Sequence, residues 1–108
     1  GASMFDTGTL PIFSEFVGSF LDMAPQQIEE LKEAYSLQDA EGVRLAAHTL
    51  KGSCSFLGIE SLTAACLDME EAGRTNTLDG RRDVLDRIET DLSALRRDLL
   101  EEPRAPAD

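Results

Sequence analysis

Histidine, cysteine and long apolar runs are all scarce in this sequence, and each scarcity excludes a class of protein. The only histidine is His48, and the two cysteines, Cys54 and Cys66, have no CxxC motif and no histidine beside them. A zinc site needs about four closely spaced ligands, so no metal site is expected. No apolar run is long enough to cross a bilayer, and no secretory segment is apparent. We therefore expect free, buried thiols in a reducing cytoplasm.

Basic residues are also few, ten against twenty-one acidic ones, and the formal net charge is -11 at pH 7. Such a surface repels phosphates, which argues against nucleic acids and anionic membranes as partners. A chain of 108 residues suits one domain. We place it at residues 9–101, with residues 1–8 as a cloning remnant or disordered N-terminus and residues 102–108 as a disordered tail.

Strand-like alternation is absent, and helical spacing dominates. Apolar residues recur every three or four positions in five stretches, near 9–21, 28–37, 43–57, 62–73 and 85–100. Pro25 lies between the first two, where it can begin a new helix or kink a continuous one. Asp39 is expected to cap the third stretch and Gly58 to end it. The pattern predicts an all-α fold, an up-and-down antiparallel four-helix bundle with an additional N-terminal helix.

The third stretch is expected to turn His48 away from the core. With about 100° per residue, the apolar seam falls within about 40° of Val43. Its members are Val43, Ala47, Leu50, Cys54 and Leu57. His48 then lies at about 140° and Gly52 at about 180°, while Arg44, Lys51 and Ser55 lie at about 80 to 120°. The imidazole should face solvent, with a cation one turn away.

This arrangement suits phosphoryl chemistry at His48. A neutral imidazole has one ring nitrogen free to act as a nucleophile at pH 7. Lys51 can offset the negative charge of a phosphoryl group, and Ser55 can supply a hydrogen bond. Glycine within a helix costs about 1 kcal/mol relative to alanine, and access to His48 is a better explanation for Gly52 than core packing. The alternative is an incidental histidine on a solvated helix face.

The stretch "AAHTLKGSCSFLG", followed by "LTAACLDMEEAGR", closely resembles the histidine phosphotransfer (HPt) domain family. The resemblance implies a four-helix bundle in which His48 accepts a phosphoryl group from a receiver-domain aspartate and passes it to another. It also implies that Lys51 orients and neutralises that group while Gly52 provides clearance. Such a domain is not an enzyme in the usual sense and needs no cofactor, because Mg²⁺ belongs to the receiver.

The resemblance further implies bacterial-type two-component signalling in the cytoplasm. The expected partners are response-regulator receiver domains and a hybrid sensor histidine kinase, and we expect a monomer. The competing interpretation is a non-catalytic helical module that binds receivers or other proteins. A third, the phosphorylatable domain of a chemotaxis kinase, would require a long catalytic chain downstream.

The sequence does not decide which residues form the docking surface. Leu45 and Phe56 can form an apolar patch for a receiver, or can be covered by the first helix. Glu70 and Arg74 are four residues apart and are expected to form a surface ion pair. A place for Arg74 at the docking rim, with Arg44 on the neighbouring helix, is the second interpretation.

Overall fold

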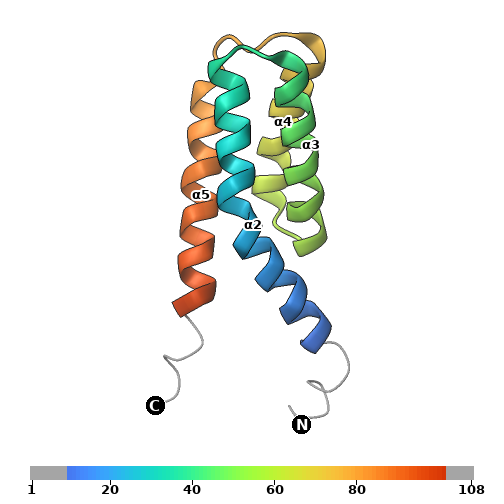
Figure 1. The fold of residues 1–108 in the computed structure, drawn as a ribbon, viewed down its shortest axis with the longest axis vertical. Coiled ribbons are helices and arrows are strands. Elements are labelled where there is room, and N and C mark those ends of the chain that lie inside the picture. The colour runs from blue at the N-terminus through green and yellow to red at the C-terminus, as the bar shows by residue number, and fades with distance from the viewer. Residues whose placement is uncertain (1–9, 102–108) are drawn as a thin grey trace.

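Four antiparallel helices make up the part of the chain described by the computed structural model, residues 10–101. They are α2 (Leu10–Ser36), α3 (Ala40–Leu57), α4 (Glu60–Thr75) and α5 (Arg82–Glu101). Figure 1 shows them running alternately up and down, with the turns after α2 and α4 at one end and the turn after α3 at the other. The all-α, up-and-down four-helix bundle is thus confirmed. The segments predicted as disordered, residues 1–8 and 102–108, lie outside the described residues.

The expected additional N-terminal helix is not separate from the bundle within the described residues. Its segment forms the first part of α2, which continues through Pro25 as one helix of 27 residues. Of the two roles considered for this proline, the kink within a continuous helix is the one observed. In Figure 1 the lower, blue part of α2 leans away from the axis of its upper part. A proline in a helix interior removes a backbone donor and bends the helix.

Both predicted caps of α3 are present. The Asp39 carboxylate accepts a hydrogen bond from the backbone N–H of Gly42 at 3.1 Å. Gly58 has a φ of 77°, and its N–H donates to the Ser55 carbonyl at 3.0 Å. A left-handed residue there satisfies the last carbonyls of the helix and reverses the chain. Only Gly58 and Ile59 separate α3 from α4, so these two helices form a tight hairpin.

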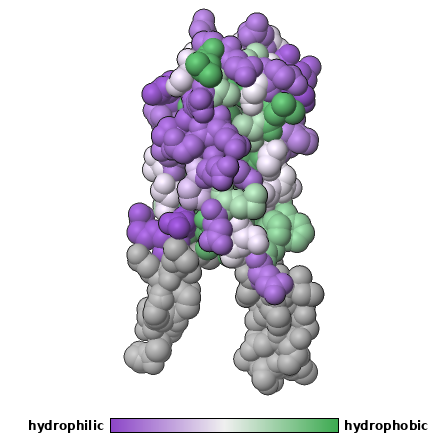
Figure 2. All heavy atoms as spheres, in the orientation of Figure 1, coloured by the Kyte–Doolittle hydropathy of each residue, from purple (hydrophilic) through white to green (hydrophobic). Residues whose placement is uncertain are grey.

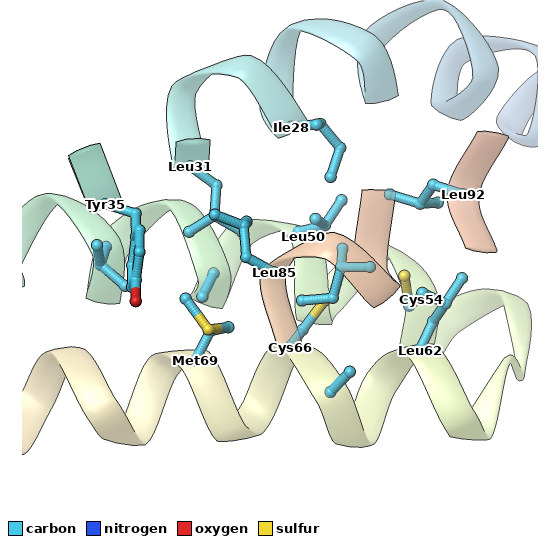
Figure 3. Close-up of a cluster of buried hydrophobic side chains, with 14 of the residues drawn as sticks. Ile28, Leu31, Tyr35, Leu50, Cys54, Leu62, Cys66, Met69, Leu85 and Leu92 are labelled. Carbon is cyan, nitrogen blue, oxygen red and sulfur yellow. The ribbon is translucent and has the colours of Figure 1, made fainter. Parts of the chain in front are cut away.

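The core consists of the apolar stripes that the sequence predicts. Figure 3 shows side chains from all four helices meeting in one cluster. Its buried members include Ile28, Leu31 and Tyr35 from α2, Val43, Ala47, Leu50 and Cys54 from α3, Leu62, Cys66 and Met69 from α4, and Leu85, Ile88 and Leu92 from α5. Leu57 and Leu95 are partly buried against it. Cys54 and Cys66 are free and buried, as predicted.

A glycine sets the separation between α3 and α4. A Cβ on Gly73 would lie 2.6 Å from the backbone nitrogen of Arg44 and 2.7 Å from the carbonyl oxygen of Ala40. These distances are far below van der Waals contact, so only glycine allows the two backbones to come this close. The close approach brings polar side chains of α4 within reach of the exposed face of α3.

Candidate functional site

The imidazole of His48 projects from the middle of α3 into solvent. Its side chain is 62% exposed, whereas the neighbouring Ala47 is fully buried. The apolar seam is packed inward against the core, and this fixes the rotation of α3 about its own axis. The predicted outward orientation of His48 is therefore observed.

A carboxylate on the adjacent helix holds the imidazole. Glu70 of α4 places Oε2 2.9 Å from Nδ1 of His48 and Oε1 2.7 Å from Nζ of Lys51. The Glu70 side chain is only 14% exposed, and that of Lys51 is 27% exposed. One carboxylate thus bridges two of the predicted site residues of α3, His48 and Lys51, from a mostly buried position.

The electrostatics of this bridge decide which imidazole nitrogen is free. Contact with the Lys51 ammonium lowers the pKa of the Glu70 carboxyl, and the His48 hydrogen bond acts in the same direction, against the effect of burial. Glu70 is therefore ionised at neutral pH and can only accept hydrogen bonds. The proton of a neutral imidazole must then be on Nδ1, which leaves the lone pair on Nε2.

Gly52 and Ser55 follow His48 along α3, one and two helical turns after it. A Cβ built on Gly52 would meet nothing within 4 Å, so no packing contact within the described residues requires a glycine there. Ser55 is exposed one turn after Lys51. Open space at Gly52 leaves one flank of the imidazole clear for an approaching group.

The predicted ion pair between Glu70 and Arg74 is wrong. Arg74 pairs with Glu71 within its own helix, while Glu70 turns toward α3. Arg44 similarly pairs with Glu41, with its Nη2 2.6 Å from Oε2 of Glu41. Contact with Glu41 raises the pKa of Arg44, contact with Glu71 raises that of Arg74, and Glu70 adds to both through space. The ion-pair partner of each guanidinium group is thus a glutamate of its own helix, Glu41 or Glu71, and not Glu70.

Phe56 is both in contact with the first part of α2 and exposed. Its ring centroid lies 4.2 Å from that of Phe16, with 52° between the ring planes, yet Phe56 remains 65% exposed. Leu45 is 51% exposed and Met23 of α2 is 54% exposed. Figure 2 shows apolar surface at the lower end of α3, on a face that is otherwise mostly hydrophilic. Contact with α2 thus leaves much of the predicted docking patch open.

Comparison with known proteins agrees with this geometry. Residues 15–98 match the model of the family described as the Hpt domain. This chain belongs to the Hpt domain family. The fold is similar to that of histidine-containing phosphotransfer protein B (HptB) from Pseudomonas aeruginosa PAO1, with a TM-score of 0.80 and 22% identity, over 98% of this chain and 91% of that one.

A curated relative of this Hpt domain is the sensor protein TorS of Escherichia coli (strain K12). It is 35% identical over 57 residues, which make up 53% of this chain and 6% of TorS. The chain therefore corresponds to a small part of that relative's length.

The contact between Glu70 and His48 in this Hpt domain was missed by reasoning from single helices. A signal for it was present in the sequence. His48 is eleven residues before Ile59 and Glu70 is eleven residues after it. In a tight antiparallel hairpin, residues equally far from the turn lie at the same level. Together with a glycine that allows close approach, this spacing indicates a cross-helix pair.

Two further features describe this Hpt domain. Residues 10–101 include no helix that is both long and apolar enough to cross a membrane. Within the same part of the chain, no three histidine, cysteine or acidic side chains are grouped so that they could hold a metal ion.

Proposed function

We propose that this Hpt domain is a phosphorelay intermediate that carries a phosphoryl group on Nε2 of His48. The observation that supports it best is the Glu70 contact with Nδ1, which leaves Nε2 as the solvent-facing nucleophile. In the proposed step, Nε2 attacks the phosphorus of a receiver's aspartyl phosphate. The N–P bond forms, the P–O bond to the aspartate breaks, and the aspartate carboxylate leaves with the electron pair. Transfer to a second receiver reverses these changes.

Glu70 stabilises the charge that this attack creates. Nδ1 keeps its proton while Nε2 donates its lone pair, so positive charge develops on the imidazole ring. The ionised Glu70 carboxylate, 2.9 Å from Nδ1, is already in place to stabilise that charge. Lys51 is proposed to offset the negative charge of the phosphoryl group, and Ser55 to donate a hydrogen bond to it.

The proposed partners are response-regulator receiver domains and a hybrid sensor histidine kinase. The family supports this class of partner, and the sensor-protein relative supports a place in a sensor relay. Mg²⁺ is assigned to the receiver. For docking we propose the exposed apolar side chains Leu45, Phe56 and Met23, with Arg44 and Arg74 at their rim. Leu45 and Phe56 are on the same helix as His48, and Met23 lines a groove with Ala46 and Thr49 of that helix. We propose that the domain acts as a cytoplasmic monomer.

The test is intact-mass measurement after treatment with phosphoramidate, a small phosphoryl donor. The wild type should gain one acid-labile phosphoryl group, and His48→Gln should gain none. Adding an unphosphorylated receiver domain with Mg²⁺ should then remove the group from the wild type. A folded wild type that gains no phosphoryl group would refute the proposal and leave the non-catalytic binding module as the better interpretation.

A further inference from the structure

Pro25 leaves one buried carbonyl of α2 without its helical donor. In a regular helix the N–H of residue 25 would donate to the carbonyl of Leu21, four residues earlier. Proline has no N–H, and Leu21 is buried, so water cannot easily replace the missing bond. A buried carbonyl of this kind needs another donor.

The donor comes from α5. Nε of Arg96 donates to the Leu21 carbonyl oxygen at 3.3 Å, across 75 positions of the sequence. Arg96 also lines a depression between α2 and α5, formed with Ala24, Pro25, Ile28 and Leu92. The guanidinium therefore reaches the kink itself and supplies the hydrogen bond that the proline removes.

Two polar side-chain contacts between α2 and α5 lie on opposite sides of the kink. Arg96 binds α2 before Pro25, and Glu89 binds it after Pro25 through Lys32, at 2.9 Å. Figure 1 shows the part of α2 before the kink leaning away from α5. Without the Arg96 bond, the direction of this first part would depend on fewer contacts.

The direction of that part of α2 determines the surface beside His48. Phe16 packs against Phe56 near the end of α3, with the two rings tilted relative to each other. Met23, which precedes the kink, lines a groove together with Thr49, the residue after His48. A change in the kink angle would therefore displace side chains that flank the phosphorylation site, while the contact between His48 and Glu70 lies between α3 and α4 and would not change.

We propose that Arg96 is a positioning residue that fixes the kink at Pro25 and thereby shapes the surface on which a receiver docks. It acts on recognition of the receiver and not on the chemistry at His48. The inference rests on the proposed function for the identity of the partner. The hydrogen bond between Arg96 and the kink can be tested without it.

The first test compares Arg96→Ala with Arg97→Ala, a matched loss of charge at an exposed neighbour. Two quantities are measured. The first is the rate of phosphorylation by phosphoramidate, which needs no docking, and the second is the rate of phosphoryl transfer as a function of receiver concentration. Arg96→Ala should raise the receiver concentration for half-maximal transfer about three- to tenfold, the size expected for the net loss of one ordinary intramolecular hydrogen bond. The phosphoramidate rate and the transfer rate at saturation should not change. Arg97→Ala should behave as the wild type.

The second test restores the missing donor with Pro25→Ala. If Arg96 compensates for the proline, Arg96→Ala should have no further effect on receiver dependence in the Pro25→Ala background. Backbone hydrogen exchange of the residues before the kink should be faster in Arg96→Ala than in the wild type. It should be the same in the double variant as in Pro25→Ala. An equal effect of Arg96→Ala in both backgrounds, or unchanged exchange and receiver dependence, would overturn the inference. The hydrogen-exchange measurement is valid even if phosphoramidate fails to phosphorylate His48. The proposed phosphorelay function and the proposed role of Arg96 can therefore be refuted separately.

Discussion

Replacing Gly52 with alanine is expected to stabilise the domain and slow phosphoryl transfer at the same time. Gly52 lies within α3, and a Cβ there would meet nothing within 4 Å. The new methyl group therefore causes no clash, and the helix gains the difference in propensity, about 1 kcal/mol. For a domain of this size, that gain corresponds to a rise in Tm of about 4–8 °C. Thermal and urea unfolding followed by circular dichroism measure it directly.

The same methyl group occupies the open flank of His48. We expect transfer from a phosphorylated receiver to slow about tenfold or more, because small misplacements of reacting groups carry large rate penalties. Phosphorylation by the smaller phosphoramidate should be less affected. Gly73→Ala is the control, because its Cβ would lie 2.6 Å from the backbone nitrogen of Arg44. That variant should lose about 1–3 kcal/mol or more by forcing α3 and α4 apart.

Two results would refute this reasoning about Gly52. If Gly52→Ala is more stable and still transfers the phosphoryl group at the wild-type rate, the glycine is not needed to leave space beside His48 for the receiver. If it is less stable than the wild type, the open space around Gly52 is not a feature of the folded protein.

Three other properties follow from the structure. The pKa of Glu70 is lowered, so its contribution to stability is present above about pH 4.3, the value in unfolded chains, and is lost as the pH falls toward the folded value. Urea midpoints measured from pH 7 to pH 3 should therefore fall less steeply for Glu70→Gln, and parallel curves would contradict this. Asp39→Ala should lose about 1 kcal/mol in urea unfolding, because the cap on Gly42 is removed; an unchanged midpoint would show that water replaces it. Cys54 and Cys66 are both fully buried, and contact with Cys54 and burial also raise the pKa of the Cys66 thiol. Because a reagent cannot reach either sulfur in the folded protein, both thiols should react with an aromatic disulfide reagent only in denaturant, and rapid reaction of the native protein would show that the hairpin opens.

The features predictable from the sequence are those that depend on a single helix. The apolar stripe of α3 repeats every three or four residues, and burying that stripe fixes where His48 points. Asp39 and Gly58 mark the ends of α3 because their side-chain and backbone preferences act within one turn of the chain. The fate of Pro25 was not decided locally, since a proline is compatible with either a new helix or a kink. Its outcome depends on a donor from α5, Arg96, which is far away in sequence.

The contacts of Glu70 show the same limit. The local rule for residues four apart pairs it with Arg74. In the folded domain Arg74 has Glu71 within its own helix, and Glu70 lies toward the interface, where Gly73 lets α3 come close. The pair of Glu70 with Lys51 across the two helices is less exposed than the pair of Arg74 with Glu71 along α4, and an ion pair is stronger where less water surrounds it. Only the register of the hairpin about Ile59 could have indicated this outcome.

Because the α3–α4 hairpin places Glu70 between His48 and Lys51, Lys51 has two connected roles in the proposed relay. Its contact lowers the pKa of Glu70, which keeps this carboxylate from taking the proton on Nδ1 and so keeps the lone pair on Nε2. If, as proposed, the same ammonium offsets the roughly two negative charges of a phosphoryl group on Nε2, it is shared between that group and Glu70. A cation shared between two anions stabilises the phosphorylated state less than a dedicated one would. A relay intermediate benefits from this, because a phosphoryl group held too firmly on His48 could not be passed to the next receiver.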